Sequence, residues 1–210
     1  MALDLGELVT PGHTAVVTME LQRAVVGDLA ALPDLRDAAA SVGLPATAGR
    51  VCAAARTAGV RVVHCNAAFR ADRQGSAFNS RMLAASAKLA GDRLDLGQPG
   101  VDNIPELEVQ PSDLIVERTH GLTPFTATEL DQLLRNMGVT TVIAVGNSIN
   151  VGILGLVLAA GDLGYQVVVP ADAVVGVPVE YGETVMTNTI SLLATVTTVD
   201  EILAVWSAQG

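Results

Sequence analysis

Lysine and aromatic residues are scarce in this 210-residue sequence. Lys88 is the only lysine among 12 basic residues, and 22 acidic residues bring the formal net charge to −10 at pH 7. A chain this acidic lacks the clustered bases that neutralise phosphates, so we exclude nucleic acid as a partner. With aromatic residues at 3%, the sequence provides poorly for a stacking cage around a flat ring.

Long hydrophobic runs are also missing, and cysteines are few. The longest apolar run, residues 151–160, contains two glycines and falls well short of the roughly 20 residues that span a bilayer. We therefore expect no membrane partner. The first residues carry no basic stretch before an apolar one, so we expect no secretory signal and a cytoplasmic protein. Cys52 and Cys65 then fit reduced, buried thiols.

The sequence does contain many short valine-rich runs, each followed by a small or polar residue and a helical pattern. Such continuous apolar runs are typical of buried parallel strands. Because 50% of the residues are hydrophobic, one well-buried core is feasible, and we predict a single domain over residues 1–210. The predicted fold is α/β: a three-layer, Rossmann-like arrangement of a six-stranded, mostly parallel sheet with helices on both faces.

The predicted strands are residues 15–19, 60–65, 114–116, 141–145, 166–169 and 194–199. The predicted helices are residues 44–58, 128–137, 151–163 and 180–193, with a short final helix from Asp200. Gly138 and Gly164 stand where helix ends favour a positive φ. Residues 67–112 interrupt the alternation with many glycines and prolines, and we interpret them as an irregular insertion that serves the active site or an interface.

Three segments, in order, resemble motifs of the isochorismatase-like hydrolases, a family that includes nicotinamidases and other cysteine amidohydrolases. TAVVTMELQRAVVG at 14–27 resembles the first strand, which usually ends Asp-Met-Gln-Asn. DLIVERTHGLTPFTATEL at 113–130 resembles the segment that carries a lysine. GNSINVGILGLVLAAGDLGY at 146–165 resembles the helix entry that carries the nucleophilic cysteine. The resemblance covers most of the chain and implies the same fold.

The resemblance also shows where this sequence departs from the family. The Asp, Lys and Cys of the amidohydrolases fall on Glu20, Arg118 and Gly152. No thiolate then starts the helix whose N-terminus would lower its pKa and hold an oxyanion. Neither Cys52, within a predicted helix, nor Cys65, at a strand end, replaces it. Cysteine-dependent amide hydrolysis is therefore disfavoured.

One chemistry that the family implies needs no cysteine. Isochorismatases hydrolyse a vinyl ether, with the first-strand carboxyl as a general acid, and Glu20 could take that role. Arg118 either pairs with Glu20 or binds a carboxylate or carbonyl of the substrate, because a guanidinium donates hydrogen bonds and accepts none. Gly152 either leaves a side-chain-sized space beside backbone N–H groups or allows close helix packing.

Further candidate site residues come directly after the predicted strands. In open parallel sheets, ligands bind at the edge of the sheet where the strands end. Asn66 and Arg70 are candidates for holding the substrate, since related enzymes use a polar side chain and an arginine there. His64 fits a satisfied histidine at the strand end. The remaining candidates for lining the same substrate site are His120, Phe125, Asn147 and Asn150. Phe125 matches a phenylalanine of the family.

We expect neither a metal nor another cofactor. The nicotinamidase metal pattern, Asp-x-His, corresponds to Ala67 and Phe69, and no other cluster has zinc spacing. Gly97 and Gly100 do not follow a strand, which argues against a dinucleotide site. The expected partners are a small substrate or ligand with a carboxylate or carbonyl, and further copies of the chain in a homodimer or homotetramer.

Three functions stay open. The first is hydrolysis of a small enol ether or organic acid with Glu20 as acid. The second is a catalytically inactive family member that binds a small ligand or serves as an assembly subunit. The third is an amidohydrolase with another nucleophile such as Ser148, which has no evident base beside it.

Overall fold

The computed structural model describes residues 4–209 and contains one parallel sheet with strand order β3-β2-β1-β4-β5-β7, in which β6 also pairs with β4. The α/β class and the parallel sheet are confirmed, but the predicted number of strands was wrong: the described sheet has seven. The strands are β1 Thr14–Met19, β2 Arg61–Ala67, β3 Leu114–Arg118, β4 Thr141–Asn147, β5 Gln166–Pro170, β6 Val174–Val175 and β7 Thr195–Thr197.

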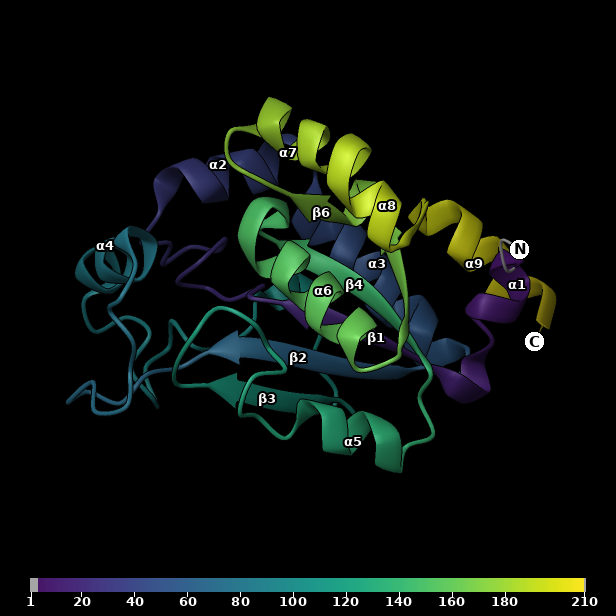
Figure 1. Cartoon of the computed structure of the whole chain (residues 1–210), viewed down its shortest axis with the longest axis horizontal. Coiled ribbons are helices and arrows are strands. Elements are labelled where there is room, and N and C mark those ends of the chain that lie inside the picture. The colour runs from purple at the N-terminus through teal and green to yellow at the C-terminus, as the bar shows by residue number, and fades with distance from the viewer. Residues whose placement is uncertain (1–3, 210) are drawn as a thin grey trace.

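Helices connect the strands and cover the sheet. They are α1 Leu5–Leu8, α2 Pro33–Ser41, α3 Leu44–Thr57, α4 Arg81–Ala90, α5 Leu130–Asn136, α6 Leu154–Asp162, α7 Val179–Val185, α8 Ser191–Leu193 and α9 Val199–Gln209. π-Helical turns at Ile149–Ile153 and Met186–Ile190 lead into α6 and α8. In Figure 1, α5 and α6 lie in front of the sheet and α3 lies behind it.

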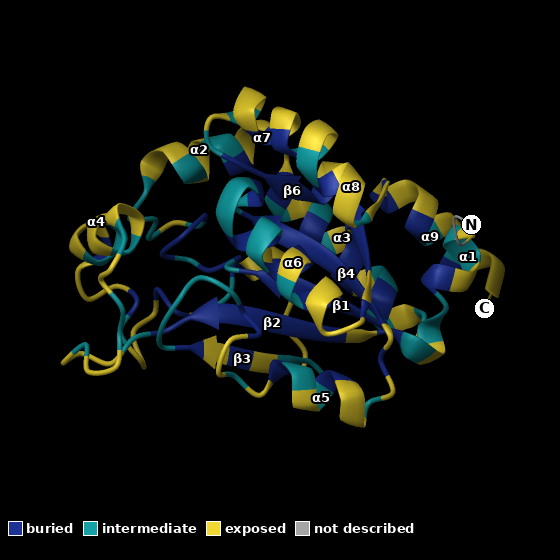
Figure 2. Cartoon of the chain, in the orientation of Figure 1, coloured by how far each residue is buried: buried dark blue, intermediate teal, exposed yellow. Residues whose placement is uncertain are grey.

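Two apolar clusters, one on each face, explain this layering. On β1, Val16 belongs to the cluster packed against α3 and α9, whereas Val17 belongs to the cluster packed against α5 and α6. Successive side chains of a strand point to opposite faces, so one valine-rich strand supplies both layers. Figure 2 shows the result: buried strands inside, and helices that expose their outer faces. Burying each Leu or Val contributes about 1.5–3 kcal/mol.

Helix ends follow the predicted turn chemistry in two places. Gly138 and Gly164, just beyond α5 and α6, have φ of 73° and 89°, the left-handed region that glycine adopts without a Cβ penalty. The end of the chain differs from the prediction. Residue Val199 already begins α9, where its N–H donates to Asp172 Oδ1 at 2.9 Å, so β7 is shorter than residues 194–199 and Asp200 lies inside the helix.

The segment 67–112 is largely irregular, but it contains α4, which the sequence reading did not anticipate. Ser80 caps this helix by accepting a hydrogen bond from the N–H of Leu83 at 3.2 Å. Gln22 ties the segment to the sheet: its Nε2 donates to the carbonyls of Ala67 and Val101, and its Oε1 accepts from the N–H of Ala67. The insertion is thereby held against the carboxyl ends of β1 and β2.

Within residues 4–209, none of the helices has both the length and the apolarity needed to cross one.

Candidate active site

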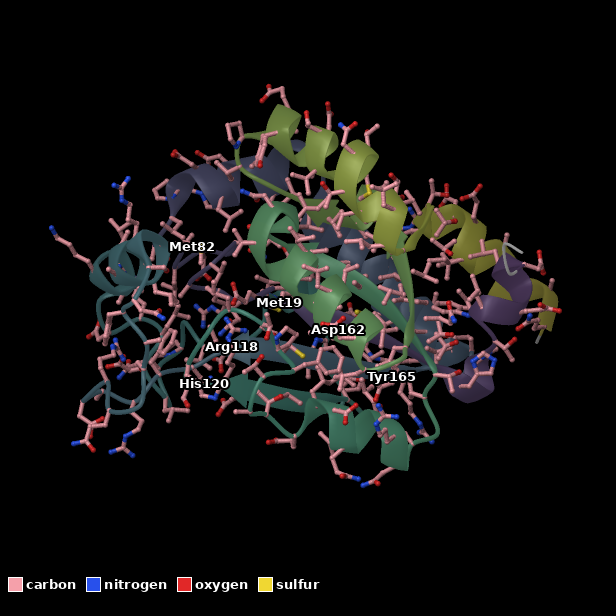
Figure 3. The ribbon with its side chains drawn as sticks, viewed as in Figure 1. Met19, Met82, Arg118, His120, Asp162 and Tyr165 are labelled. Carbon is pink, nitrogen blue, oxygen red and sulfur yellow. The ribbon has the colours of Figure 1, made fainter. Side chains whose placement is uncertain are left out.

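A cavity of about 170 Å³ lies at the carboxyl ends of the central strands. Glu20 directly follows β1, Arg118 is the last residue of β3, and Gly152 lies in the π-helical turn after β4. All three line the cavity. The topology brings them together because the carboxyl ends of parallel strands share one edge of the sheet. Arg118 and Met19 mark this edge in Figure 3.

Glu20 and Arg118 form an ion pair inside the cavity. Arg118 Nη2 donates to Glu20 Oε1, and Arg118 Nε donates to the carbonyl of Gly121 at 3.2 Å. The arginine side chain is 4% exposed and the glutamate side chain 21%. Arg118 Nη1 is buried and has no hydrogen-bond partner among the described residues. The pair therefore holds a guanidinium that still has donors to offer.

A small residue on β2 lets Arg118 reach Glu20. Strand β2 lies between β3 and β1, and neighbouring strands are about 4.8 Å apart, so the pair must cross one strand. Ala67 is the Cα partner of Arg118 in the β2–β3 register and also lines the cavity. A larger side chain at this position would stand between the guanidinium and the carboxylate.

Asn147 joins the end of β4 to the end of β1. Its Nδ2 donates to the backbone carbonyl of Glu20 at 3.0 Å, while its Oδ1 is buried without a described partner. The preceding Gly146 has φ of 122°, and a Cβ there would come within 2.4 Å of Met19 O. Only glycine allows this approach of the two strands. The Asn147–Ser148 peptide bond is cis.

Gly152 packs tightly, so the structure does not support the side-chain-sized space considered above. A Cβ on this residue would meet the backbone oxygen of Asn147 at 3.0 Å and Met19 Cε at 3.1 Å. Both contacts are closer than an ordinary van der Waals contact. The alternative reading, close packing of the helix start, fits this geometry, and a side chain at position 152 would have to displace Met19.

The rest of the cavity wall is mostly apolar and comes from α2, which we did not predict as part of the site, and from the segment 67–112, which we interpreted as an active-site or interface insertion without naming these residues. Helices α2 and α4 and the loops beside them contribute Leu32, Leu35, Met82, Leu83 and Leu94. Ser86 and Ser148 add hydroxyls. Nothing in the pattern of these leucines distinguishes them from core residues, because a substrate wall and a core use the same side chains. Met82, on α4, lies above Arg118 in Figure 3.

Of the other predicted site residues, only Asn147 lines this cavity. Asn66 lines a different cavity. Arg70 is 55% exposed and forms a bidentate pair with Asp72. The remaining three take part in local contacts: His120 Nε2 lies 3.4 Å from Ala127 O, Phe125 packs against Tyr165 at 5.8 Å between ring centroids, and Asn150 Nδ2 donates to Val177 O at 3.4 Å.

Neither cysteine belongs to the cavity wall. Burial raises the pKa of Cys52 and of Cys65 to about 12, so both stay protonated at neutral pH. Within residues 4–209, no group of three or more His, Cys, Asp and Glu side chains is arranged to hold a metal ion.

A second buried arginine–carboxylate pair, Arg56–Asp113, lies on the α3 side of the sheet. Arg56 donates from Nε and Nη2 to the two carboxylate oxygens of Asp113 at 3.1 and 2.8 Å. Asp113 also contacts His64 Nε2 at 3.3 Å, and His64 Nδ1 lies 2.8 Å from Thr18 Oγ1. Both ring nitrogens of His64 thus have partners, which fits the predicted satisfied histidine.

The carboxyl edge of a parallel α/β sheet, where the Glu20–Arg118 pair lies, is the place at which open-sheet enzymes bind small molecules. The isochorismatase domain family model matches residues 14–201, and the chain belongs to this family. It is 28% identical over 213 residues to the ureidoacrylate amidohydrolase RutB of Pseudomonas syringae, covering 95% of this chain and 86% of that protein.

Solved structures share the fold of this chain. A cysteine hydrolase from Pseudomonas syringae pv. phaseolicola superposes with a TM-score of 0.78 at 23% identity, covering 95% of each chain. N-carbamoylsarcosine amidase from Thermoplasma acidophilum superposes with a TM-score of 0.69 at 25% identity, covering 90% of this chain and 97% of that one. The predicted family resemblance is confirmed.

Proposed function

We propose that this chain is an isochorismatase-family hydrolase that works without a cysteine nucleophile, on a small enol ether or related organic acid. The observation that carries the proposal is the Glu20–Arg118 pair, which lies in a small cavity with Arg118 Nη1 unpartnered among the described residues. In this proposal Arg118 anchors the substrate and Glu20 moves the proton.

Arg118 suits a substrate carboxylate or carbonyl. A guanidinium remains charged and offers planar donors that match a carboxylate. Its Nη1 is buried, and a buried donor without a partner costs about 1–3 kcal/mol, which a bound oxygen would recover. The apolar wall of Leu32, Leu35 and Leu83 would then take the hydrocarbon part of the substrate.

Substrate binding would prepare Glu20 to act as an acid. In the structure the carboxylate accepts a hydrogen bond from Arg118. A substrate carboxylate that draws on the same guanidinium adds a second negative charge beside a single positive one. Like charges and exclusion of water both favour the neutral form of a carboxyl group. In this proposal the carboxyl group of Glu20 acts in its neutral form, as a general acid must.

The reaction then needs no covalent bond between the enzyme and the substrate. Protonated Glu20 gives its proton to the enol carbon, and the resulting oxocarbenium ion adds water. Loss of a proton from the added water to Glu20 gives a hemiketal, which collapses to a carbonyl compound and an alcohol. Glu20 ends the cycle as it began, and a positioned acid of this kind contributes about 100-fold to 10,000-fold in rate.

The test is product formation by the purified chain with isochorismate, other enol ethers and primary amides, in parallel with Glu20→Gln. We expect turnover of an enol ether that falls at least about 100-fold in Glu20→Gln. Glu180→Gln, an exposed substitution on α7 with the same change of charge, is the matched control and should keep full activity. Circular dichroism should show that both variants are folded.

Two results would contradict the proposal. Turnover that survives Glu20→Gln would remove Glu20 as the acid. Cleavage of an amide, lost in Ser148→Ala, would favour the amidohydrolase activity that the names of two relatives carry. We rank that activity lower because the cavity wall, formed by described residues, contains Ser148 but no Cys, Lys or His.

A second candidate is a binding or assembly role without catalysis. The composition of the cavity wall favours this role, because Gly152 and Arg118 stand where the family's amidohydrolases have a cysteine thiol and a lysine amine. A folded protein that is silent across the panel, yet binds a small carboxylate with an affinity that Arg118→Gln lowers, would support this role instead.

We also propose that the chain forms a homodimer or homotetramer. Leu192, on α8, is 81% exposed, and Tyr181, Leu158 and Leu193 on α6 to α8 are each more than 40% exposed. Exposed apolar surface of this kind favours association. Sedimentation equilibrium that gives only a species near the monomer mass of 21.6 kDa at micromolar concentration would contradict it.

A cytoplasmic location remains our proposal as well. Both cysteines are free thiols, which fits a reducing compartment. Fractionation of the source cells, with the chain detected by an antibody, would test it.

A further inference from the structure

A second cavity, of about 290 Å³, lies beside β2 and the edge strand β3. Asn66 lines it, whereas the next residue, Ala67, lines the cavity of Glu20 and Arg118. Because successive side chains of a strand point to opposite faces, the two cavities lie on opposite faces of the sheet. The lining residues are Asn66, Val101, Asp102, Asn103, Ile104, Pro105, Val109, Ile115 and Glu117.

Two asparagines that line this cavity have buried side-chain oxygens without partners among the described residues. Asn66 is 2% exposed; its Nδ2 donates to Val101 O at 3.3 Å, and its Oδ1 has no described partner. Asn103 Oδ1 is likewise buried and unpartnered. Most buried polar atoms in proteins are hydrogen-bonded, so two such oxygens in the wall of one cavity indicate a ligand that donates hydrogen bonds.

The charges of the cavity point to a cation. Glu117 is the Cα partner of Asn66 in the β2–β3 register, and its exposed carboxylate has no ion-pair partner among the described residues. Asp102 adds a second carboxylate, which approaches Arg23 at 4.0 Å. The lining includes neither Lys nor Arg. Acceptors of negative or partial negative charge therefore surround the space without a compensating cation in its wall.

The loop that carries these oxygens is held in place by backbone hydrogen bonds. Arg23 N–H donates to Asp102 O at 2.9 Å, and Ile104 N–H donates to Leu21 O at 3.0 Å. Gln22, between them, pairs with Asn103 as an isolated antiparallel bridge. A site fixed in this way loses little conformational entropy when a ligand binds.

We propose that this cavity binds a primary alkylammonium ion. An –NH₃⁺ group has three donors and no acceptor, which matches Asn66 Oδ1, Asn103 Oδ1 and a carboxylate. Val101, Ile104 and Ile115 provide apolar surface for the alkyl chain. A metal ion fits less well, because within residues 4–209 no three His, Cys, Asp or Glu side chains are grouped to hold one. The proposal is independent of the function proposed for Glu20 and Arg118.

The experiment is titration calorimetry of the full chain with n-pentylammonium chloride, with neutral 1-pentanol and with MgCl₂ as separate arms. We expect saturable binding of n-pentylammonium at one site per chain. Glu117→Gln, at an exposed position, should weaken it about fivefold. Asn66→Leu, which removes the buried acceptor, should weaken it at least about tenfold. Glu180→Gln again serves as the control of equal charge and should leave the affinity unchanged.

Each contrary result has a distinct meaning. Equal weakening by Glu117→Gln and Glu180→Gln would assign the binding to the overall charge of the chain. Comparable affinity for 1-pentanol would assign it to apolar contact, and tighter binding of Mg²⁺ would assign it to a metal site. No binding to the folded wild-type chain at millimolar n-pentylammonium would refute the proposal outright. If Asn66→Leu does not fold, Glu117→Gln and Asp102→Asn decide the question.

Discussion

Two buried arginine–carboxylate pairs lie close to β2, and they differ in how completely they are satisfied. Arg56 and Asp113 form a bidentate pair, and Asp113 also accepts from Gln110 N–H at 2.9 Å, while Arg56 Nη2 donates to Leu107 O at 2.8 Å. Arg118 and Glu20 share a single described hydrogen bond, and Arg118 Nη1 has no described partner. The first pair joins segments of the scaffold, and the second lines a cavity.

The difference shows how a buried charge can be assigned to structure or to function. A buried ion pair is stable only when further hydrogen bonds satisfy its remaining donors and acceptors. Arg56 and Asp113 meet that condition with protein atoms: no buried side-chain atom of either residue lacks a described partner. Arg118 and Glu20 leave donors and acceptors at a cavity, at a cost in stability that a substrate would offset. In the function that we propose, incomplete satisfaction beside a cavity, rather than burial or charge alone, distinguishes the Glu20–Arg118 pair from the Arg56–Asp113 pair.

The sharpest test of this comparison substitutes each carboxylate by its amide. Asp113→Asn puts an NH₂ group against donors from Arg56, Gln110 and the neighbouring His64, and we expect a loss of about 3–5 kcal/mol in the free energy of unfolding. Glu20→Gln keeps an oxygen for its one described bond, and the side chain at position 20 is 21% exposed, so we expect a smaller loss of about 1–3 kcal/mol. Urea denaturation followed by circular dichroism measures both.

Equal losses for the two variants would break the comparison. It would mean that the Glu20–Arg118 pair holds the fold together as firmly as the Arg56–Asp113 pair does. A loss above about 3 kcal/mol for Glu20→Gln would also weaken the activity test, because the variant would be partly unfolded.

A second test uses pH and concerns only the scaffold pair. Burial lowers the pKa of His64 below its ordinary 6.5, although the hydrogen bond to Asp113 acts in the opposite direction. The unfolded chain therefore takes up a proton near pH 6.5 while the folded chain stays neutral, so the free energy of unfolding should fall as pH drops through 6.5. The slope is at most about 1.4 kcal/mol per pH unit.

One variant separates this histidine from other groups. His64→Gln should flatten the dependence between pH 7.5 and pH 5.5, the range that brackets the ordinary value of 6.5, whatever its effect on absolute stability. A slope that persists in His64→Gln would show that His64 titrates alike in both states.

The sequence was sufficient for the positions where strands end. Val-rich runs located most of the strands, and the rule that their carboxyl ends share one edge brought Glu20, Arg118 and Gly152 to one cavity. The sequence was not sufficient to predict the face of the sheet to which each side chain points. Asn66 and Ala67 are neighbours in sequence, yet alternation along β2 places them in different cavities. A shift of one residue in the strand end decides which of them faces the ion pair.

Helices α2 and α4 were not predicted from the sequence. Each buries a single residue, Ala39 in α2 and Ala90 in α4, and α4 stands in the glycine- and proline-rich segment 67–112, which we interpreted as irregular although the apolar side chains of α4 do recur with a helical period. The two-residue strand β6 is too short for any pattern. Both helices contribute leucines to the cavity wall. The sequence pointed to the segment 67–112 as an active-site or interface insertion, but it did not show which side chains of that segment, or of α2, would form the wall.

The smallest expected effect is on the reactivity of the two cysteine thiols, one of which lies beside each arginine–carboxylate pair. Cys52 lies near Arg56 and Asp113, and Cys65 lies near Arg118 and Glu20. In both places the arginine lowers the pKa of the thiol and the carboxylate raises it, so these influences oppose each other and burial, the largest cause, sets the value at about 12. We expect neither thiol to react with 5,5′-dithiobis(2-nitrobenzoate) at pH 8, and both to react in guanidinium chloride.

Reaction of one thiol alone would sharpen the comparison between the two pairs. Thiol reagents attack through the thiolate and need access, so labelling of Cys65 with Cys52 protected would show that water enters from the cavity side. Cys65→Ala would then abolish the reaction and Cys52→Ala would not. The reverse pattern, reaction at Cys52, would contradict our assignment of the Arg56–Asp113 pair, because a fully satisfied network should not open while the incompletely satisfied one stays closed.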